Sequence, residues 1–243
     1  VPFNSAEKAC EAVSAVFQAG ITPSALEFIE RDAIDWTLKY SDIKLKVNND
    51  VKAHLLIEVD GNDSEKLYKE CEQIFSVMQE FECGEILLAD SETQKNQLWK
   101  LRRSVGEAVK SNSIYKEEDT VVPRAELAKL LSGVKKIGKA YGFQSVCYGH
   151  AGDGNLHVNI IKGKMSDHDW NLKLSSGIRE IFELTKSLGG TISGEHGIGL
   201  VQKDYMDIVL SEQNIKIQKG IKTLFDPNMI LNPGKIFVQT IKI

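Results

Sequence analysis

The spacing of apolar residues along the chain predicts a mixture of amphipathic helices and short strands. Segments in which apolar residues recur every three to four positions are typical of helices and cover residues 1–20, 63–81, 92–110, 124–141, 167–188 and 211–225. Short apolar runs bounded by polar or turn-forming residues are typical of strands and cover residues 54–59, 85–89, 119–123, 145–148 and 156–161. The pattern favours an α+β layered fold of the ferredoxin-like type, with a mainly antiparallel sheet, helices packed on one face and a helical C-terminal third.

Polar residues mark where one predicted helix begins, and the chain ends in a tail without helical periodicity. Asp63 or Ser64 can cap the helix that follows, because either side chain can accept a hydrogen bond from its first backbone N–H groups. We expect a single domain over residues 1–243. Within it, residues 226–243 form the tail, which we expect to be extended over residues 231–237.

Composition and charge exclude several classes of partner. The chain has 243 residues, 42% of them hydrophobic, so it can bury a sizeable core. Its formal net charge of −4 is spread over interspersed acidic and basic residues, which argues against binding to nucleic acid or to an anionic membrane. No apolar run approaches the roughly 20 residues that span a bilayer, and no signal peptide opens the chain, so a cytoplasmic location is expected. No C-x-x-C pair occurs, and reduced thiols are expected at Cys10, Cys71, Cys83 and Cys147.

Three of the five histidines lie in two glycine-framed segments, residues 148–159 and 190–199. A tight turn at residues 152–155 would bring His150 and His157 together from its two sides. His157 and Asn159 lie two positions apart on a strand and therefore face the same side of the sheet.

A glutamate in the second segment completes a set of metal ligands. Two histidines and Glu195 form the three-ligand pattern of catalytic divalent metal sites that leave one position open. Neighbouring residues of an extended loop point in different directions, so His196 can face a substrate as a general base. The alternative is that these are hydrogen-bonded structural histidines in ordinary glycine-rich turns.

The glycine-rich segments do not have the sequence of a nucleotide-binding loop. Gly152-x-Gly154 continues as Asn-Leu-His where a Rossmann motif has a third glycine, and residues 190–199 are not followed by Lys-Ser or Lys-Thr. We therefore do not expect a Rossmann or P-loop site.

Three segments in a fixed order carry a resemblance to a known family. Residues 149–157 read Gly-His-Ala-Gly-Asp-Gly-Asn-Leu-His, residues 193–199 read Ser-Gly-Glu-His-Gly-Ile-Gly, and residues 225–235 contain Phe-Asp-Pro and Leu-Asn-Pro-Gly-Lys. They resemble the C-terminal domain of FAD-linked oxidases of the vanillyl-alcohol-oxidase superfamily. The most similar members are D-lactate dehydrogenases, the flavin subunit of glycolate oxidase and D-2-hydroxyglutarate dehydrogenase. The resemblance extends from about residue 20 to the end of the chain.

The resemblance implies a division of roles among the residues of the two segments. His150, His157 and Glu195 would hold a divalent metal, which could be Zn, Mn, Fe or Co, against a small 2-hydroxyacid. His196 would take the proton of the substrate hydroxyl while hydride passes to FAD, and Asn159 would lie beside the substrate.

The resemblance also implies residues that bind the substrate carboxylate and face the flavin. The arginine that grips the carboxylate in the family corresponds to Arg102, and Lys116 lies near a lysine that binds the same anion, although that alignment needs a gap of one residue. Asn232 and Lys235 match a tail that returns toward the flavin domain. Gly106 falls where some relatives have a hydroxyl residue near the substrate.

In the family the FAD lies on a domain N-terminal to this one, and nothing here resembles that domain's Gly- and Asn-rich flavin loop. We therefore expect the chain to need an N-terminal FAD domain or a flavin subunit for turnover, and a homo-oligomer is compatible with the sequence. Two other functions stay open. One is a metallohydrolase, in which the same three ligands activate water. The other is a non-catalytic subunit that binds a metal or an acid and docks on a flavoenzyme.

Overall fold

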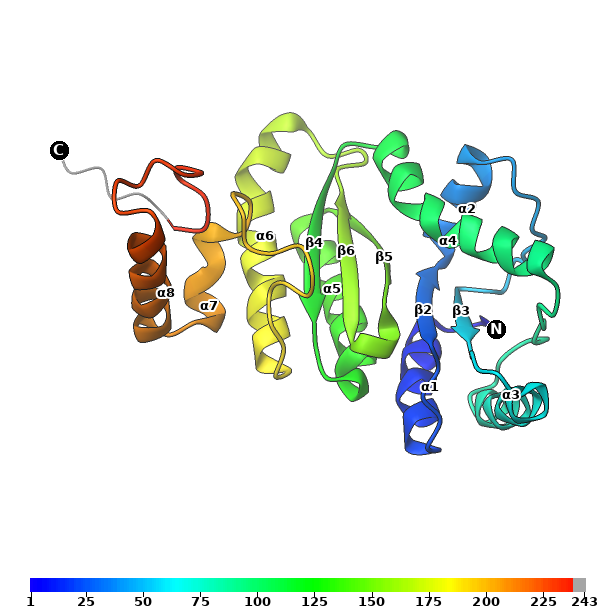
Figure 1. Ribbon diagram of the computed structural model, residues 1–243. Helices are drawn as coiled ribbons and strands as arrows, with labels where there is room; N and C mark the ends of the chain where they lie inside the picture. The colour runs from blue at the N-terminus through cyan, green and yellow to red at the C-terminus, as the bar shows by residue number, and fades with distance from the viewer. Residues whose placement is uncertain (238–243) are drawn as a thin grey trace.

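The structure is a computed structural model that describes residues 1–237, and its centre is a six-stranded sheet. The strands lie in the order β1-β3-β2-β5-β6-β4, and all neighbouring strands are antiparallel (Figure 1). Their bounds are β1 Pro2–Phe3, β2 Ala25–Glu30, β3 Ala53–Glu58, β4 Tyr115–Val121, β5 Gln144–Gly149 and β6 Asn155–Ile161. The mainly antiparallel sheet expected from the sequence is confirmed.

Helices alternate with the strands and then dominate the C-terminal third, as expected. Their bounds are α1 Ala6–Gln18, α2 Arg31–Tyr40, α3 Ser64–Gln79, α4 Glu92–Asn112, α5 Leu127–Tyr141, α6 Asp167–Ser187, α7 Met206–Val209 and α8 Glu212–Phe225. Short 3-10 turns lie at η1 Arg124–Glu126, η2 Ala151–Asp153 and η3 Lys203–Tyr205. Asp63 caps α3, since its carboxylate accepts hydrogen bonds from the backbone N–H groups of Glu65 and Lys66.

The alternation of side chains along each strand divides the molecule into two layers of packing. On one face, which we call the core face, apolar residues of the strands pack against α1, α3, α5 and α6, as Phe28, Cys147 and Val158 do. On the opposite face, α2 and α4 cover a second apolar cluster that includes Ile29 and Tyr148. Helices therefore cover both faces of the sheet, with α1, α3, α5 and α6 on the core face and α2 and α4 on the other. Glu117 and Asp119 of β4, with His157 and Asn159 of β6, lie on this opposite face, which we call the site face.

A tight hairpin joins β5 to β6 and brings the histidine segment together. Tyr148 pairs with His157 across the two strands, and η2 makes the turn between them. Gly154 has a φ of +76°, and a side chain there would collide with the carbonyl oxygen of Val122, so glycine is required at this position.

Two predictions of local structure are wrong. Residues 85–89 form no strand, although their sequence is a short apolar run of the kind typical of strands. In the structure β1 is a two-residue edge strand beside β3, and the chain bridges it only at Cys83, before this segment, while Leu87 and Leu88 are exposed. Residues 231–237 are not extended but form turns, with positive φ angles at Asn232 and Ile236.

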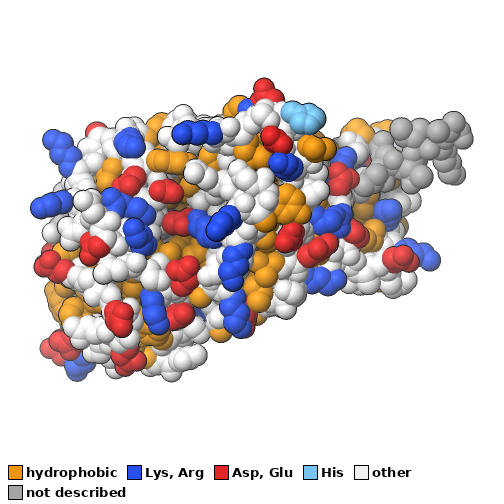
Figure 2. All heavy atoms as spheres, turned by 180° about the vertical axis from the view of Figure 1, so that it is seen from behind, with side chains coloured by type: hydrophobic (Ala, Val, Ile, Leu, Met, Phe, Trp, Pro, Cys, Tyr) orange, Lys and Arg blue, Asp and Glu red, His pale blue; other side chains and the backbone are white. Residues whose placement is uncertain are grey.

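Helices α7 and α8 lie at one end of the molecule, and α3 lies toward the other (Figure 1). No residue of α8 is buried, and several of its apolar side chains are exposed, among them Leu224 and Phe225 at 77% and 79%. Lysine, arginine and acidic side chains are interspersed over the face shown in Figure 2. None of the helices within residues 1–237 combines the length and apolar character needed to cross a membrane.

Candidate functional site

His150, His157 and Glu195 converge on the site face. Oε1 of Glu195 lies 3.6 Å from Nε2 of His150 and 3.4 Å from Nε2 of His157. One ligand atom from each of the three residues lies within 4.8 Å of the others. The sequence prediction that two histidines of the hairpin and a glutamate of a distant loop meet at one point therefore agrees with the geometry.

A carboxylate from β2 fixes the orientation of His150. Nδ1 of His150 lies 2.8 Å from Oε1 of Glu27, which leaves Nε2 directed toward Glu195. This hydrogen bond raises the pKa of His150. Although burial opposes its ionisation, Glu27 keeps a lowered pKa because of the hydrogen bond from His150 and the charge of Arg102. Such a carboxylate behind a histidine is the usual partner of a metal-binding imidazole.

His157 is suited to bind a cation because it is neutral. Its side chain is buried, and burial lowers its pKa to about 4. At neutral pH it therefore offers a free nitrogen lone pair. Its Nδ1 has no hydrogen-bond partner among the described residues and lies 3.6 Å from Oε1 of Glu117.

One carboxylate of β4 binds the part of the loop that carries Glu195 and His196, beyond the backbone bridge between Val121 and Thr191. Oδ2 of Asp119 accepts hydrogen bonds from the backbone N–H groups of Gly194, Glu195 and His196 at 2.8, 2.8 and 2.9 Å. Burial opposes the ionisation of Asp119, but these N–H donors outweigh it and lower its pKa. The loop passes so close to Asn155 that a Cβ at Gly194 would lie 2.5 Å from its Nδ2. This attachment sets the directions of the two side chains that follow.

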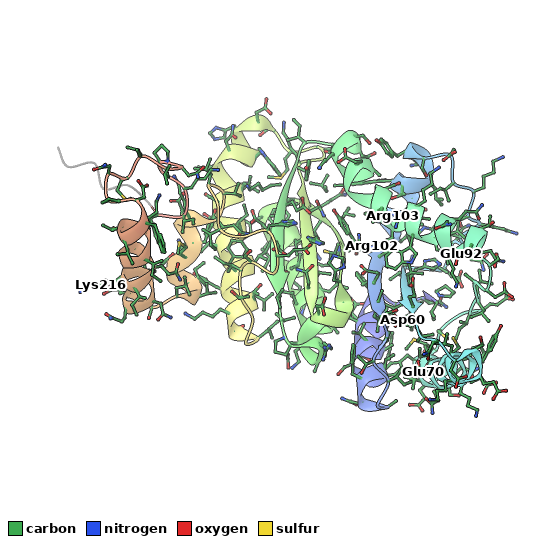
Figure 3. The ribbon with its side chains drawn as sticks, in the orientation of Figure 1. Asp60, Glu70, Glu92, Arg102, Arg103 and Lys216 are labelled. Carbon is green, nitrogen blue, oxygen red and sulfur yellow. The ribbon has the colours of Figure 1, made fainter. Side chains whose placement is uncertain are left out.

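Arg102 lies on α4, beside the cluster and next to Arg103 (Figure 3). Nε of Arg102 donates a hydrogen bond of 2.8 Å to Oε2 of Glu27, the same carboxylate that binds His150. Its Nη2 is buried without a partner among the described residues. Glu27 therefore binds both His150, a candidate metal ligand, and Arg102, whose Nη2 has no partner among the described residues.

The structure places Asn159 at the cluster but does not bring Lys116 there. Asn159 is buried on the site face, and its Nδ2 has no partner among the described residues. Lys116 pairs with Ile160, whose side chain lies in the core-face cluster, so Lys116 belongs to the other side of the sheet. Glu117 occupies the site face instead, opposite Asn159. The sequence alignment that suggested Lys116 is ambiguous by one residue, and one residue reverses the face of a strand.

The predicted flavin-facing residues lie on the C-terminal turns. Asn232 and Lys235 are exposed, and the backbone N–H of Lys235 donates to the carbonyl of Asn232 at 3.3 Å. The backbone N–H of Ile236 donates to the carbonyl of Gly199, which ends the glycine-rich loop, at 2.6 Å. The described part of the tail therefore returns to the loop that carries Glu195. Residues 238–243 of the predicted tail lie outside the described residues.

The donor set fits a divalent metal. It consists of two imidazole nitrogens and a carboxylate oxygen, the ligands preferred by zinc and related ions, with one histidine already oriented by Glu27. A second set, Glu117, His157 and His196, also has ligand atoms within 4.8 Å of one another. Since both sets use His157, His196 is either a base beside the first metal position or a ligand of the second.

Sequence reasoning missed Glu27, Glu117 and Asp119 as parts of the site. Glu27 lies in β2, a strand that the sequence analysis did not assign. The available signal in the sequence was an acidic residue with apolar residues on both sides, and this glutamate is buried in the structure. Asp119 lies in a predicted strand, where a buried acid needs donors from elsewhere in the chain. The alternation of side chains along β4 predicts that Glu117 faces the site only when the residue at which β4 begins is known.

Comparison with known proteins places this chain in a family. Residues 1–236 match the family described as FAD linked oxidases, C-terminal domain. The D-lactate dehydrogenase of Anaerostipes hadrus is 33% identical over 241 residues, which cover 97% of this chain and 51% of that protein. The D-2-hydroxyglutarate dehydrogenase of Stutzerimonas stutzeri is 32% identical over 231 residues, which cover 91% of this chain and 48% of that protein.

A further relative is similar in sequence, and two solved structures are similar in fold. The glycolate oxidase subunit GlcD of Bacillus subtilis is 33% identical, and the match covers 98% of this chain and 50% of that protein. Substrate-bound p-cresol methylhydroxylase shares the fold with a TM-score of 0.62 at 13% identity, over 98% of this chain and 52% of that one. The isoeugenol complex of 4-ethylphenol oxidase from Gulosibacter chungangensis also has a TM-score of 0.62, at 12% identity and with the same coverage.

The chain thus spans about half the length of the curated relatives described above. The family match itself covers nearly all of it, and the three motifs of the sequence analysis lie within the matched residues. This chain belongs to the FAD linked oxidases, as a C-terminal domain of that family.

Proposed function

We propose that this chain is the substrate- and metal-binding half of an FAD-dependent dehydrogenase that oxidises a D-2-hydroxyacid. The bridge formed by Glu27 carries the proposal: one of its oxygens bonds His150 and the other bonds Arg102. A 2-hydroxyacid has its hydroxyl and carboxylate on adjacent carbons. A cation-binding histidine and an arginine held by one side chain match that pair of groups. Three relatives whose names describe the oxidation of such acids support the substrate class.

Each residue of the cluster has a task in this proposal. His150, His157 and Glu195 would hold the metal, and Arg102 would bind the substrate carboxylate through its remaining N–H groups. Nδ2 of Asn159, buried without a partner among the described residues, would donate to a substrate oxygen. When bound, the metal would lower the pKa of the substrate hydroxyl and the flavin would accept the hydride.

His196 would remove the hydroxyl proton at Nε2. This atom lies 3.9 Å from Oε1 of Glu195, so it faces the metal-binding side of the cluster. Its side chain is 47% exposed, which leaves room for a substrate against it. Asp119 fixes the backbone at His196 and thereby the position of the base. The divalent metal itself, its identity among Zn, Mn, Fe and Co, and the general-base role are parts of the proposal.

The flavin would come from a partner domain or subunit. Asn232 and Lys235, on turns attached to the end of the Glu195 loop, would face it. The exposed apolar side chains of α8 lie at the same end of the chain and support a contact there. All four cysteines lie within the described residues as free thiols, which supports a reducing, cytoplasmic location as part of the proposal.

Oxidation of D-2-hydroxyacids by the flavin-loaded protein that contains this chain tests the proposal. We expect reduction of the flavin by D-lactate, glycolate or D-2-hydroxyglutarate, and not by L-lactate. A chelator should remove the activity and added divalent metal should restore it. Hydrolysis of an ester or amide by the zinc-loaded chain, with no oxidation of any 2-hydroxyacid, would favour the metallohydrolase and contradict the proposal.

A further inference from the structure

We infer that Glu117 selects substrates whose side group carries no second carboxylate, so that the substrate class is a small monocarboxylic 2-hydroxyacid. This inference rests on the proposed function. The sequence analysis assigned no role to Glu117 and expected the preceding Lys116 at the site instead.

The position of Glu117 follows from the pairing of β4 with β6. Glu117 pairs with Asn159, and Asp119 pairs with His157, so these four side chains share the site face. Lys116 directly precedes Glu117, pairs with Ile160 and therefore belongs to the core face. The anionic residue of the pair Lys116 and Glu117 is therefore the one directed to the site.

Two contacts hold the carboxylate of Glu117 at the cluster. The hydroxyl of Tyr148 donates a hydrogen bond to Oε1 of Glu117 at 3.4 Å. The same oxygen lies 3.6 Å from Nδ1 of the metal-ligand candidate His157. The side chain of Glu117 is 25% exposed, so its charge is poorly screened by water.

No basic side chain of the described residues neutralises Glu117. Within residues 1–237, no lysine or arginine nitrogen lies within 4.0 Å of its carboxylate. Nε of Arg102 donates a hydrogen bond to Glu27, and the other N–H groups of Arg102 are available to one substrate carboxylate. Lys110 lies at the exposed end of α4 and pairs with Glu107 at 2.8 Å.

A second carboxylate on the substrate would therefore meet a negative charge and no cation of this chain. Two like charges about 5 Å apart in a partly buried site repel strongly enough to cost about 10-fold or more in binding. A hydrogen or a methyl group in the same place suffers no such repulsion.

The test compares kcat/KM for D-lactate and for D-2-hydroxyglutarate in the flavin-loaded protein. The wild type should prefer D-lactate. Glu117→Gln should raise the ratio of kcat/KM for the dicarboxylate over the monocarboxylate by about 10-fold, and Glu117→Lys should raise it further. Glu117→Asp keeps the charge and should keep the preference. Glu107→Gln removes an exposed glutamate of α4 and serves as the matched control.

The outcomes separate this inference from the proposed function. If both acids are oxidised and Glu117→Gln leaves their ratio unchanged while metal and flavin content stay normal, Glu117 does not set specificity and the inference is overturned. A wild-type preference for the dicarboxylate would also overturn it, with the proposed function intact. If neither acid nor any other 2-hydroxyacid reduces the flavin, the proposed function falls and the inference falls with it.

Discussion

Oδ2 of Asp119, on β4, accepts the backbone N–H of His196 at 2.9 Å, and it accepts the N–H groups of the two preceding residues as well. A side chain of the sheet thus fixes the backbone of the loop that carries a metal ligand and the base. Hydrogen bonds to a charged acceptor are stronger than neutral ones, so the loop depends on this charge.

Replacing that charge should loosen the loop. Asp119→Asn is expected to weaken metal affinity by about 10-fold or more and to speed hydrogen exchange at the amides of residues 194–196, because a neutral amide cannot accept all three N–H groups as well. Titration with Zn²⁺ and amide exchange measure the two effects. Asp207→Asn, an exposed aspartate on α7, is the control. Unchanged exchange in the Asp119→Asn variant would show that the loop is held by other contacts.

We expect Glu27 to strengthen metal binding through its hydrogen bond to His150. Glu27→Gln weakens the acceptor that orients the imidazole and lowers its basicity, so metal affinity should fall by about 10- to 100-fold. Metal content of the purified variant and competition with a chelator measure the loss. Glu7→Gln, an exposed change on α1, should retain wild-type affinity. If Glu27→Gln retains it too, the bond from Glu27 does not orient a ligand.

Arg102 should act mainly on the substrate carboxylate. Arg102→Ala is expected to raise KM for the acid and to lower kcat/KM by about 100-fold or more, because a bidentate partner of the carboxylate is lost. Part of the decrease in kcat/KM will arise because Glu27 loses Arg102, its buried ion-pair partner. Arg103→Ala changes the exposed neighbour on α4 and should have little effect. Equal kinetics for the wild type and the Arg102→Ala variant would assign the arginine a structural role only.

The stability of the domain should fall with rising pH because of Glu118. This carboxyl is buried on the core face of β4 and accepts a hydrogen bond of 3.3 Å from Gln202, and burial raises its pKa from 4.5 to about 7. The folded state therefore holds this proton to higher pH than the unfolded chain does. Stability from this group is fully present below pH 4.5 and decreases as the pH rises through about 7.

The expected loss is about 3 kcal/mol of unfolding free energy between these two pH values. Urea unfolding at a series of pH values measures it. Glu118→Gln cannot ionise and should lack this decrease, whereas Glu107→Gln should keep it. A decrease of the same size in the Glu118→Gln variant would place its origin in another group.

Local patterns predicted most of the fold, and long-range pairing accounts for the errors. The helices over α3, α4 and α6 and the β5–β6 hairpin follow from periodicity, caps and turn glycines. The segment at residues 85–89 has the composition of a strand, but the edge strand β1 has only two residues, and the chain bridges it at Cys83 alone. No local pattern indicates how long the partner strand at a sheet edge is.

The same contrast holds for the residues of the candidate site: local motifs predicted some of them, and long-range strand pairing places the others. The motifs indicated His150, His157 and Glu195 because each lies beside glycines that serve turns. Glu27 comes from a strand more than a hundred residues before them, and its role appears only when β2 pairs with β5. Whether Lys116 or Glu117 faces the site depends on the register of β4, which an uncertainty of one residue reverses.

The separate roles of Glu195 and His196 are the central claim, and metal content measured beside kcat tests it most directly. In the flavin-loaded protein, Glu195→Gln should weaken metal binding, and excess metal should recover part of the activity. His196→Ala should retain the metal yet lose about 10²- to 10⁴-fold in kcat, and excess metal should not restore it. The opposite result, with metal lost from the His196→Ala and Glu117→Gln variants and retained by Glu195→Gln, would place the metal at the second ligand set and contradict the account.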